Sequence, residues 1–169
     1  MGSTGRTPRL GRLRQRGFSL IEAMILIGIV AILATLAVPT YLDKIIRDQV
    51  VEALPLADAA KGPIAAAWAG TQTFPADNAA ATLPAPDKFV SYVVTSVTVR
   101  SGAIDIKFGN RANGILKGKM LTFRPAVVED APVVPITWVC GYATAPDKMT
   151  IKGTNNTTVP APYLPIKCR

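Results

Sequence analysis

The hydrophobic residues of this chain are concentrated near its beginning. The run 23–42 holds 20 residues without a charged side chain, most of them Ile, Leu, Val, Met and Ala. A helix of about 20 apolar residues can cross the roughly 30 Å hydrocarbon core of a bilayer. The run is also longer than the apolar core of an ordinary secretory signal, about 7–15 residues. The pattern therefore predicts a membrane-spanning helix.

The helical pattern continues beyond this run as an amphipathic stripe. Apolar residues recur at spacings of three and four, at Leu42, Ile46, Val50, Ala53, Ala57, Ala60, Ile64 and Ala67. Charged residues of the same segment lie mostly off the stripe. We expect one long helix from about Phe18 to about Trp68. Pro39, Pro55 and Pro63 are each expected to kink it or loosen it locally, because proline removes a backbone donor.

The second half of the chain has the composition and alternation of β-strands. In Ala103–Phe108, apolar residues alternate with Asp105 and Lys107. The other expected strands are Phe89–Val99, Met120–Val127 and Ile136–Tyr142. We expect a hairpin turn at Ser101-Gly102, a Pro-rich loop over Thr71–Lys88 and a turn over Asn110–Gly118.

Because the helical stripe must bury against this sheet, the sequence predicts an α+β fold. A long N-terminal α-helix, with a membrane-spanning half and an amphipathic half, is expected to pack on an antiparallel sheet of about four strands.

The charge of the chain is uneven. The formal net charge is +8, but without residues 1–17 the chain has 14 basic and 11 acidic residues, a net charge of +3. The basic character is thus largely a property of the first 17 residues and says little about a nucleic-acid surface. Because these arginines precede the apolar run, the positive-inside rule places that end in the cytoplasm and the C-terminal domain outside it.

Few residues suit catalysis or metal binding. The chain has no histidine, which removes the commonest general base and the commonest zinc ligand. No phosphate-binding loop is present, and the aspartates form no calcium-loop pattern. We therefore expect neither an enzyme nor a metal or cofactor site.

One acidic residue interrupts the apolar N-terminal stretch. Glu22 lies between Ile21 and Ala23, and an ionised carboxylate at membrane depth normally has a partner and a role. The alternative is a solvated residue in the headgroup region.

The two cysteines, Cys140 and Cys168, lie near the C-terminus and form no C-x-x-C motif. A distant pair in an exported domain indicates a disulfide, which would close a loop of about 29 residues; the alternative is two free buried thiols.

The segment Gly17-Phe18-Ser19-Leu20-Ile21-Glu22, with its basic leader and apolar run, resembles the class III signal of type IV pilins and type II secretion pseudopilins. The resemblance implies that prepilin peptidase cleaves between Gly17 and Phe18 and that the amine of Phe18 is then methylated. It also implies that Glu22 pairs with the free amine of a neighbouring subunit's Phe18. Pro39 matches a proline position of the family's helix, where bending or melting on assembly is implied.

The C-terminal part strengthens this resemblance. Thr137-Trp138-Val139-Cys140 and the closing segment 163–169 are similar to the strand and tail of type IVa pilins, with their disulfide-bounded region. Lys61 and Trp68 also resemble residues near the end of the family's helix. The middle of the chain is supported by pattern alone.

The resemblance implies a domain order: residues 1–17 as a cleaved leader, 18–42 as a transmembrane and filament-core helix, and 43–169 as a periplasmic or extracellular globular domain that includes the amphipathic half of the helix. The precursor would be a single-pass inner-membrane protein that meets the pilus assembly machinery. The mature subunit would polymerise into a surface filament for adhesion, twitching motility and DNA uptake.

Two other functions stay open. A minor pilin or a type II secretion pseudopilin would share the N-terminal features, although the cysteine pair argues against a major pseudopilin. A DNA-receptor pilin for natural transformation is a different class of function. Its nucleic-acid contacts would come from two groups of basic residues. The tail contributes Lys148, Lys152, Lys167 and Arg169, and a turn contributes Arg111, Lys117 and Lys119.

Overall fold

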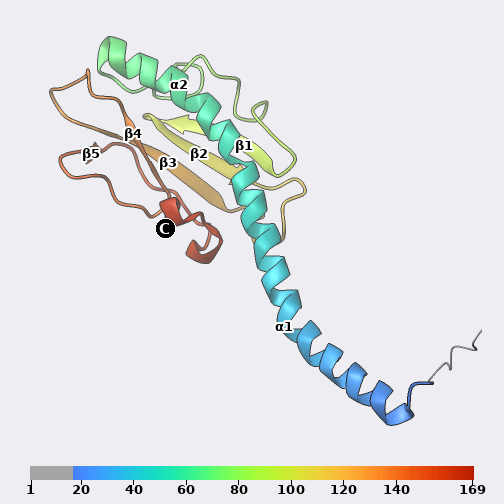
Figure 1. The fold of residues 1–169 in the computed structure, drawn as a ribbon. Helices are drawn as coiled ribbons and strands as arrows, with labels where there is room; N and C mark the ends of the chain where they lie inside the picture. The colour runs from blue at the N-terminus through green and yellow to red at the C-terminus, as the bar shows by residue number, and fades with distance from the viewer. Residues whose placement is uncertain (1–16) are drawn as a thin grey trace, which may run out of the picture. The chain divides into compact units, whose positions relative to one another are not determined.

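The computed structural model describes residues 17–169, except for the side chains of residues 36–40. Its helical part consists of α1 (Leu20–Glu52) and α2 (Leu54–Thr71) (Figure 1). The expected single helix is therefore interrupted at Ala53. Pro55 cannot donate a backbone hydrogen bond to the carbonyl four residues earlier. The N–H groups of Ala53 and Leu56 instead bond to carbonyls three residues back, at 3.2 and 3.3 Å.

The expected kinks at the other two prolines, Pro39 and Pro63, compare differently with the structure. Pro63 lies inside α2 and does not end it. Position 39 lies within α1, but the side chain of Pro39 is outside the described part of the chain. Helix α2 continues slightly past the expected end at Trp68. It closes at Gln72, whose left-handed backbone directs its N–H to the Trp68 carbonyl at 2.8 Å.

The sheet is antiparallel, as expected. Its main path runs β1-β2-β3-β4, and a short fifth strand, β5, pairs with β3 (Figure 1). The strands are β1 (Val94–Arg100), β2 (Ala103–Phe108), β3 (Met120–Val127), β4 (Thr137–Cys140) and β5 (Thr150–Ile151), followed by the 3-10 turns η1 (Ala161–Tyr163) and η2 (Ile166–Cys168). The predicted bounds of β2 and β3 are confirmed. Strand β1 begins five residues later than expected, β4 is shorter, and β5 was not anticipated.

The β1–β2 hairpin closes with the two-residue turn that the sequence predicts. Arg100 pairs with Ala103, and the residues between them, Ser101 and Gly102, have φ angles of 47° and 81°. Positive φ at both positions is the mark of a type I′ turn. A Cβ on Gly102 would lie 2.6 Å from the Phe74 ring, so glycine is also required for this close approach.

The loop after α2 covers the outer edge of β1. Asn78 is only 4% exposed, and its Nδ2 donates to the Val97 carbonyl at 2.9 Å. Its Oδ1 accepts the N–H of Val99 at 2.7 Å. The N–H of Val97 bonds to the Pro86 carbonyl at 3.3 Å. The edge groups of β1 at Val97 and the N–H of Val99 are therefore bonded within the same chain.

The core lies between the helical stripe and one face of the sheet. The buried members of the stripe are Ile46, Val50, Ala53, Ala57, Ala60 and Ile64. They share one cluster with apolar strand residues, among them Val97, Ile104, Ile106 and Leu121. Leu42, the first residue of the expected stripe, is exposed, so the packed part of α1 begins near Ile46.

The chain divides into two compact units, one ending at Pro39 and the other running from Thr40 to Arg169. Helix α1 contains the boundary, and the second unit holds the sheet, the disulfide and the core described above. Within the part of the chain that the structure describes, no helix combines the length and apolarity needed to cross a membrane.

Candidate functional site

Phe18 and the first part of α1 carry large apolar side chains that are exposed in this chain. The exposed ones are Phe18, Leu20, Ile21, Met24, Ile25, Leu26, Ile27, Ile29, Val30, Ile32 and Leu33. Residues 24–27 are consecutive, so the exposed positions go all the way round the helix rather than along one stripe. A soluble monomer rarely exposes more than a few hundred Å² of contiguous apolar surface. An apolar surface of this kind is typical of a contact site for other protein chains or for a membrane.

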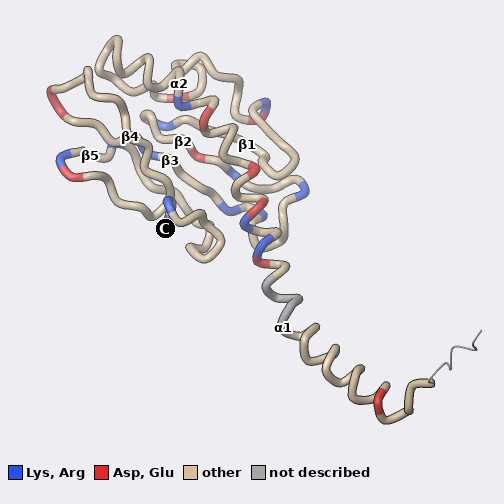
Figure 2. Tube along the Cα trace, in the orientation of Figure 1, with Lys and Arg blue, Asp and Glu red and all other residues tan. Residues whose placement is uncertain are grey.

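Glu22 is the only charged side chain between residues 17 and 35 (Figure 2). It is exposed and lies in the first turn of α1, where the positive end of the helix dipole stabilises a carboxylate. Ser19 precedes it by three residues, a Ser-x-x-Glu spacing typical of a helix N-terminus, and the Ser19 carbonyl accepts the N–H of Ala23 at 3.1 Å, an ordinary bond of the first helical turn. This position in the first turn was not expected from the sequence, although the Ser-x-x-Glu pattern is a signal for it.

The expected processing junction lies at the start of the described chain. Gly17 and Phe18 precede the helix, Phe18 is 72% exposed, and a Cβ on Gly17 would contact nothing within 4 Å. The expected leader, apart from Gly17, lies outside the described residues. The structure thus brings Gly17, Phe18 and Glu22 together in one exposed segment, with Phe18 and Glu22 at the N-terminal end of α1.

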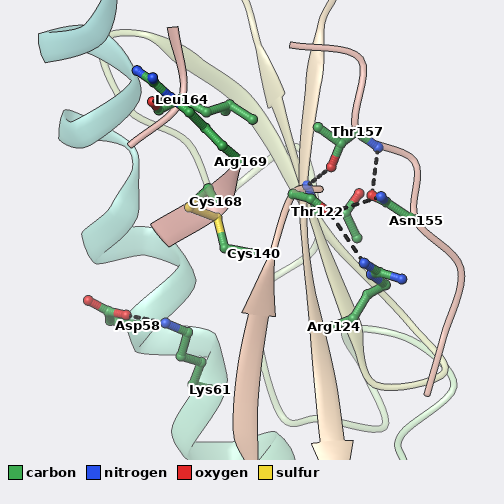
Figure 3. Close-up of a disulfide and its surroundings, with 11 residues drawn as sticks. Asp58, Lys61, Thr122, Arg124, Cys140, Asn155, Thr157, Leu164, Cys168 and Arg169 are labelled. Atoms are coloured by element: carbon green, nitrogen blue, oxygen red, sulfur yellow. Dashed lines mark hydrogen bonds and ion pairs between the residues drawn. A yellow bond between two sulfur atoms is a disulfide. The ribbon is translucent and has the colours of Figure 1, made fainter. Parts of the chain in front are cut away.

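The expected disulfide is confirmed: Cys140, the last residue of β4, is bonded to Cys168 in η2 (Figure 3). Both cysteines are buried. Gly141 has φ +59°, and a Cβ there would lie 2.5 Å from the Cys168 carbonyl oxygen. The adjacent N–H, that of Tyr142, donates to the same oxygen at 3.0 Å. Glycine therefore permits the close approach of the C-terminal backbone.

Arginine side chains join the C-terminal segment to α1. Arg169 donates from Nε to the Leu164 carbonyl at 3.0 Å and from Nη2 to the Pro162 carbonyl at 3.2 Å. Arg47, on α1, donates from Nε to the same Pro162 carbonyl at 3.1 Å. The tail is thus held at both the disulfide and the helix.

The segment 155–158 attaches the disulfide-bounded region to β3. Thr157 Oγ1 accepts the N–H of Thr122 at 3.1 Å, and Thr158 Oγ1 accepts the N–H of Met120 at 2.9 Å. Asn156 Nδ2 donates to Asp105 Oδ2 at 2.9 Å. Residues 155–158 read Asn-Asn-Thr-Thr and hold two overlapping Asn-x-Thr glycosylation sequons, and their side chains are used in internal hydrogen bonds.

Asp105 is a buried carboxylate at the centre of this attachment, only 2% exposed. The hydroxyl of Thr122 donates to its Oδ1 at 2.6 Å, and the Arg100 Nε lies 3.3 Å from its Oδ2. Buried charges are tolerated when they are paired and hydrogen-bonded. Its surroundings indicate a structural role.

Three other basic side chains have defined environments. Lys61 on α2 pairs with Asp58 at 2.7 Å and lies 4.8 Å above the Phe123 ring. Burial lowers the pKa of Arg124, whose Nη2 donates to the Gly141 carbonyl at 3.2 Å. The hydrogen bond from Lys44 to Asp48 raises the pKa of that lysine.

Among residues 17–169, no three metal-binding side chains gather into a cluster.

Comparison with known proteins agrees with these features. Residues 47–169 match the family model described as pilin (bacterial filament), and residues 12–38 match the prokaryotic N-terminal methylation motif. The chain is 35% identical to the fimbrial protein EcpC of Eikenella corrodens, with 92% of this chain and 91% of the relative aligned. It is 32% identical to the type IV major pilin protein PilE of Neisseria gonorrhoeae, over 92% of this chain and 94% of that protein. Similarity at this level along most of both chains shows that the protein belongs to the type IV pilin family.

Proposed function

We propose that this chain is a structural subunit of a type IV pilus and polymerises through the first part of α1. The observation that carries the proposal is the exposed apolar surface of residues 18–33, which has a single carboxylate at its N-terminal end. Complete burial of one Leu, Ile or Phe side chain contributes about 1.5–3 kcal/mol. Helix packing in a filament would bury many such side chains in every copy.

The processing step supplies a partner for Glu22. Cleavage between Gly17 and Phe18 would free the amine of Phe18, which would then be methylated and remain cationic. A carboxylate that leaves water requires an opposite charge nearby. In the proposed filament, Glu22 of an incoming copy pairs with the Phe18 amine of a neighbour. The match of residues 12–38 to the N-terminal methylation motif supports this step.

Before assembly, the proposed precursor is held in the inner membrane by the uncharged run 23–42, with its arginine-rich leader in the cytoplasm. Prepilin peptidase, the methylase and the pilus assembly machinery would act there on the precursor. Pro39 would allow the helix to bend or locally unwind as the subunit enters the filament. Adhesion and twitching motility would be properties of the extracellular polymer.

Mass spectrometry of filaments sheared from the cell surface tests the proposal. We expect this chain to be present with a methylated Phe18 at its N-terminus. An abundance comparable to the filament mass would identify a major subunit, whereas a trace would indicate a minor pilin. Absence of the chain from every surface filament, or a filament protein that retains the leader, would refute the proposal.

A second candidate function is DNA binding by the assembled filament. Arg111, Lys117 and Lys119 are exposed in the connection between β2 and β3, and none forms an ion pair with another described residue. Unpaired cations on a surface attract phosphates, and such binding weakens steeply with salt. Binding of duplex DNA to filaments should then fall as salt rises, and salt-independent or absent binding would exclude this function.

A further inference from the structure

The connection between β3 and β4 presents an exposed apolar side chain next to acidic residues. Val133 is 93% exposed and, with its neighbours in the connection, lines a shallow pocket beside Trp68 of α2. Glu129 and Asp130 precede it in the same connection. Glu129 is paired with Lys152, whereas Asp130 has no ion-pair partner among residues 17–169. We call Glu129, Asp130 and Val133 the valine knob.

A groove with the opposite character lies between the second half of α1 and the C-terminal segment. It has a volume of about 390 Å³ and is lined by Arg47, Val51, Leu164, Pro165, Ile166 and Arg169. The side chains that line it include two cations and no acid. Ile166 is 87% exposed, so this side chain is open to a partner. We call these residues the arginine groove.

The two arginines of the groove are fixed in position but not neutralised. Arg47 and Arg169 donate to the carbonyl oxygens of Pro162 and Leu164. No carboxylate among residues 17–169 forms an ion pair with either guanidinium. A carboxylate from another molecule would therefore complete their interactions, and charge-assisted hydrogen bonds are the stronger kind.

The knob and the groove lie at opposite ends of β4. The knob precedes Thr137, where β4 begins, and the groove belongs to the tail, which is bonded to Cys140, where β4 ends (Figure 1). None of the knob residues lines the groove of its own chain. Two different complementary surfaces on one subunit form a heterologous contact, and repetition of that contact generates a ring or an open helix.

We propose that the valine knob of one copy docks into the arginine groove of the next copy in the filament. Val133 covers the apolar groove residues Val51 and Ile166, and Asp130 pairs with Arg47 or Arg169. This inference rests on the proposed function, because only polymerisation repeats the contact. It adds a second contact between copies, separate from the packing of the N-terminal helices.

Paired cysteines test this contact in filaments assembled from the full chain. We expect the double variant Val133→Cys with Ile166→Cys to give a ladder of disulfide-linked multimers on non-reducing gels after mild oxidation. Each single variant should give none, and peptide mapping should show the native Cys140–Cys168 bond intact. The matched control is Val133→Cys with Ile115→Cys, because Ile115 is also an exposed apolar residue but does not line the groove. We expect no ladder from the control.

The charge component has its own test in the double-cysteine background. Asp130→Asn keeps a residue that tolerates the left-handed backbone at this position, φ 63°, and should lower the ladder yield several-fold. Asp147→Asn, which removes an exposed carboxylate elsewhere, should leave the yield unchanged.

Normal filaments without a ladder would overturn the inference while leaving the proposed function intact. A ladder of equal strength from the Ile115 control would also overturn it. Salt-sensitive retention of duplex DNA that is lost in Arg169→Gln, with no ladder, would assign the groove to nucleic acid instead. Failure of the wild-type chain to form any filament would refute the proposed function itself.

Discussion

Two substitutions of Glu22 separate pairing with a neighbouring subunit from capping of its own helix. Glu22→Gln removes the charge but keeps a residue that can serve at this position of a capping box. Glu22→Val removes both the charge and the hydrogen-bonding capacity of the side chain. Because Glu22 is exposed in the subunit, neither change leaves a cavity or an unpaired buried group in the monomer.

The two roles predict effects of different size. Loss of a charge from the first turn of a helix removes about 0.3–1 kcal/mol. Removal of one partner from a buried ion pair costs about 3–5 kcal/mol, and about 1.4 kcal/mol corresponds to a tenfold change in an equilibrium constant. Loss of the pair should therefore weaken addition of each copy at least about 100-fold, whereas loss of the charge from the cap alone should weaken it no more than several-fold.

The assay measures membrane-bound subunit and sheared filament from the same cells. We expect both variants to accumulate as membrane-bound subunit and to form few filaments, with Glu22→Gln nearly as defective as Glu22→Val. Normal filament yield from Glu22→Gln would refute charge pairing and leave Glu22 with a capping role. Loss of both pools would refute the reasoning in another way, because it would indicate a defect of insertion or processing.

Three further changes have defined outcomes. Gly17→Leu should leave uncleaved precursor in the membrane, because a side chain would obstruct close approach of the peptidase to the backbone; a mature N-terminus at Phe18 by mass spectrometry would contradict this. Cys140→Ala with Cys168→Ala should lower the unfolding free energy in urea by about 3–4 kcal/mol, and hydrogen exchange should rise more in the C-terminal region than in the helices. Asn78→Ala removes three hydrogen bonds and should lower stability by about 1.5–4.5 kcal/mol. Asn113→Ala, which removes one exposed bond, is its control, and an equal loss in both would contradict the role of Asn78.

The parts of the fold that follow from local pattern could be predicted from the sequence. Strands β2 and β3 begin and end at the predicted residues, and Ser101-Gly102 forms the expected hairpin turn. The buried positions of the helical stripe are correct from Ile46 to Ile64. In each case a periodic pattern or a turn signal in consecutive residues determines the outcome.

The predicted start of β1 at Phe89 was wrong, because side chains near this point form hydrogen bonds to backbone groups that would otherwise pair in the sheet. Residues 89–93 have strand-like composition, but the Ser91 hydroxyl oxygen accepts the N–H groups of Val93 and Val94 at 3.3 and 3.2 Å. Asn110 Nδ2 donates to the carbonyls of Ser91 and Val94, each at 2.9 Å. Such side-chain bonds to the backbone offer an alternative to strand pairing. These side-chain hydrogen bonds cannot be predicted from the pattern of apolar residues.

The candidate site could be predicted only in part from the sequence, because some of its contacts join residues that are distant in the chain. The segment 17–22 is a continuous motif, so its residues were found. The environment of Asp105 depends on Thr122 and Asn156, which are distant in sequence, and alternation along β2 gives no sign that Asp105 is buried. The arginine groove likewise combines residues 47 and 169. Contacts between distant segments need the tertiary structure.

The bonded edge of β1 affects how copies of this chain can associate. An open strand edge is a template for pairing with another chain, and a filament holds many identical edges at high local concentration. Here another strand would first have to displace the Asn78 side chain and the Pro86 carbonyl from Val97 and Val99. Growth by sheet extension, the route to amyloid-like polymers, is thereby obstructed along this edge. Copies can then be added to the polymer, or removed from it, with the backbone pairing of this edge intact.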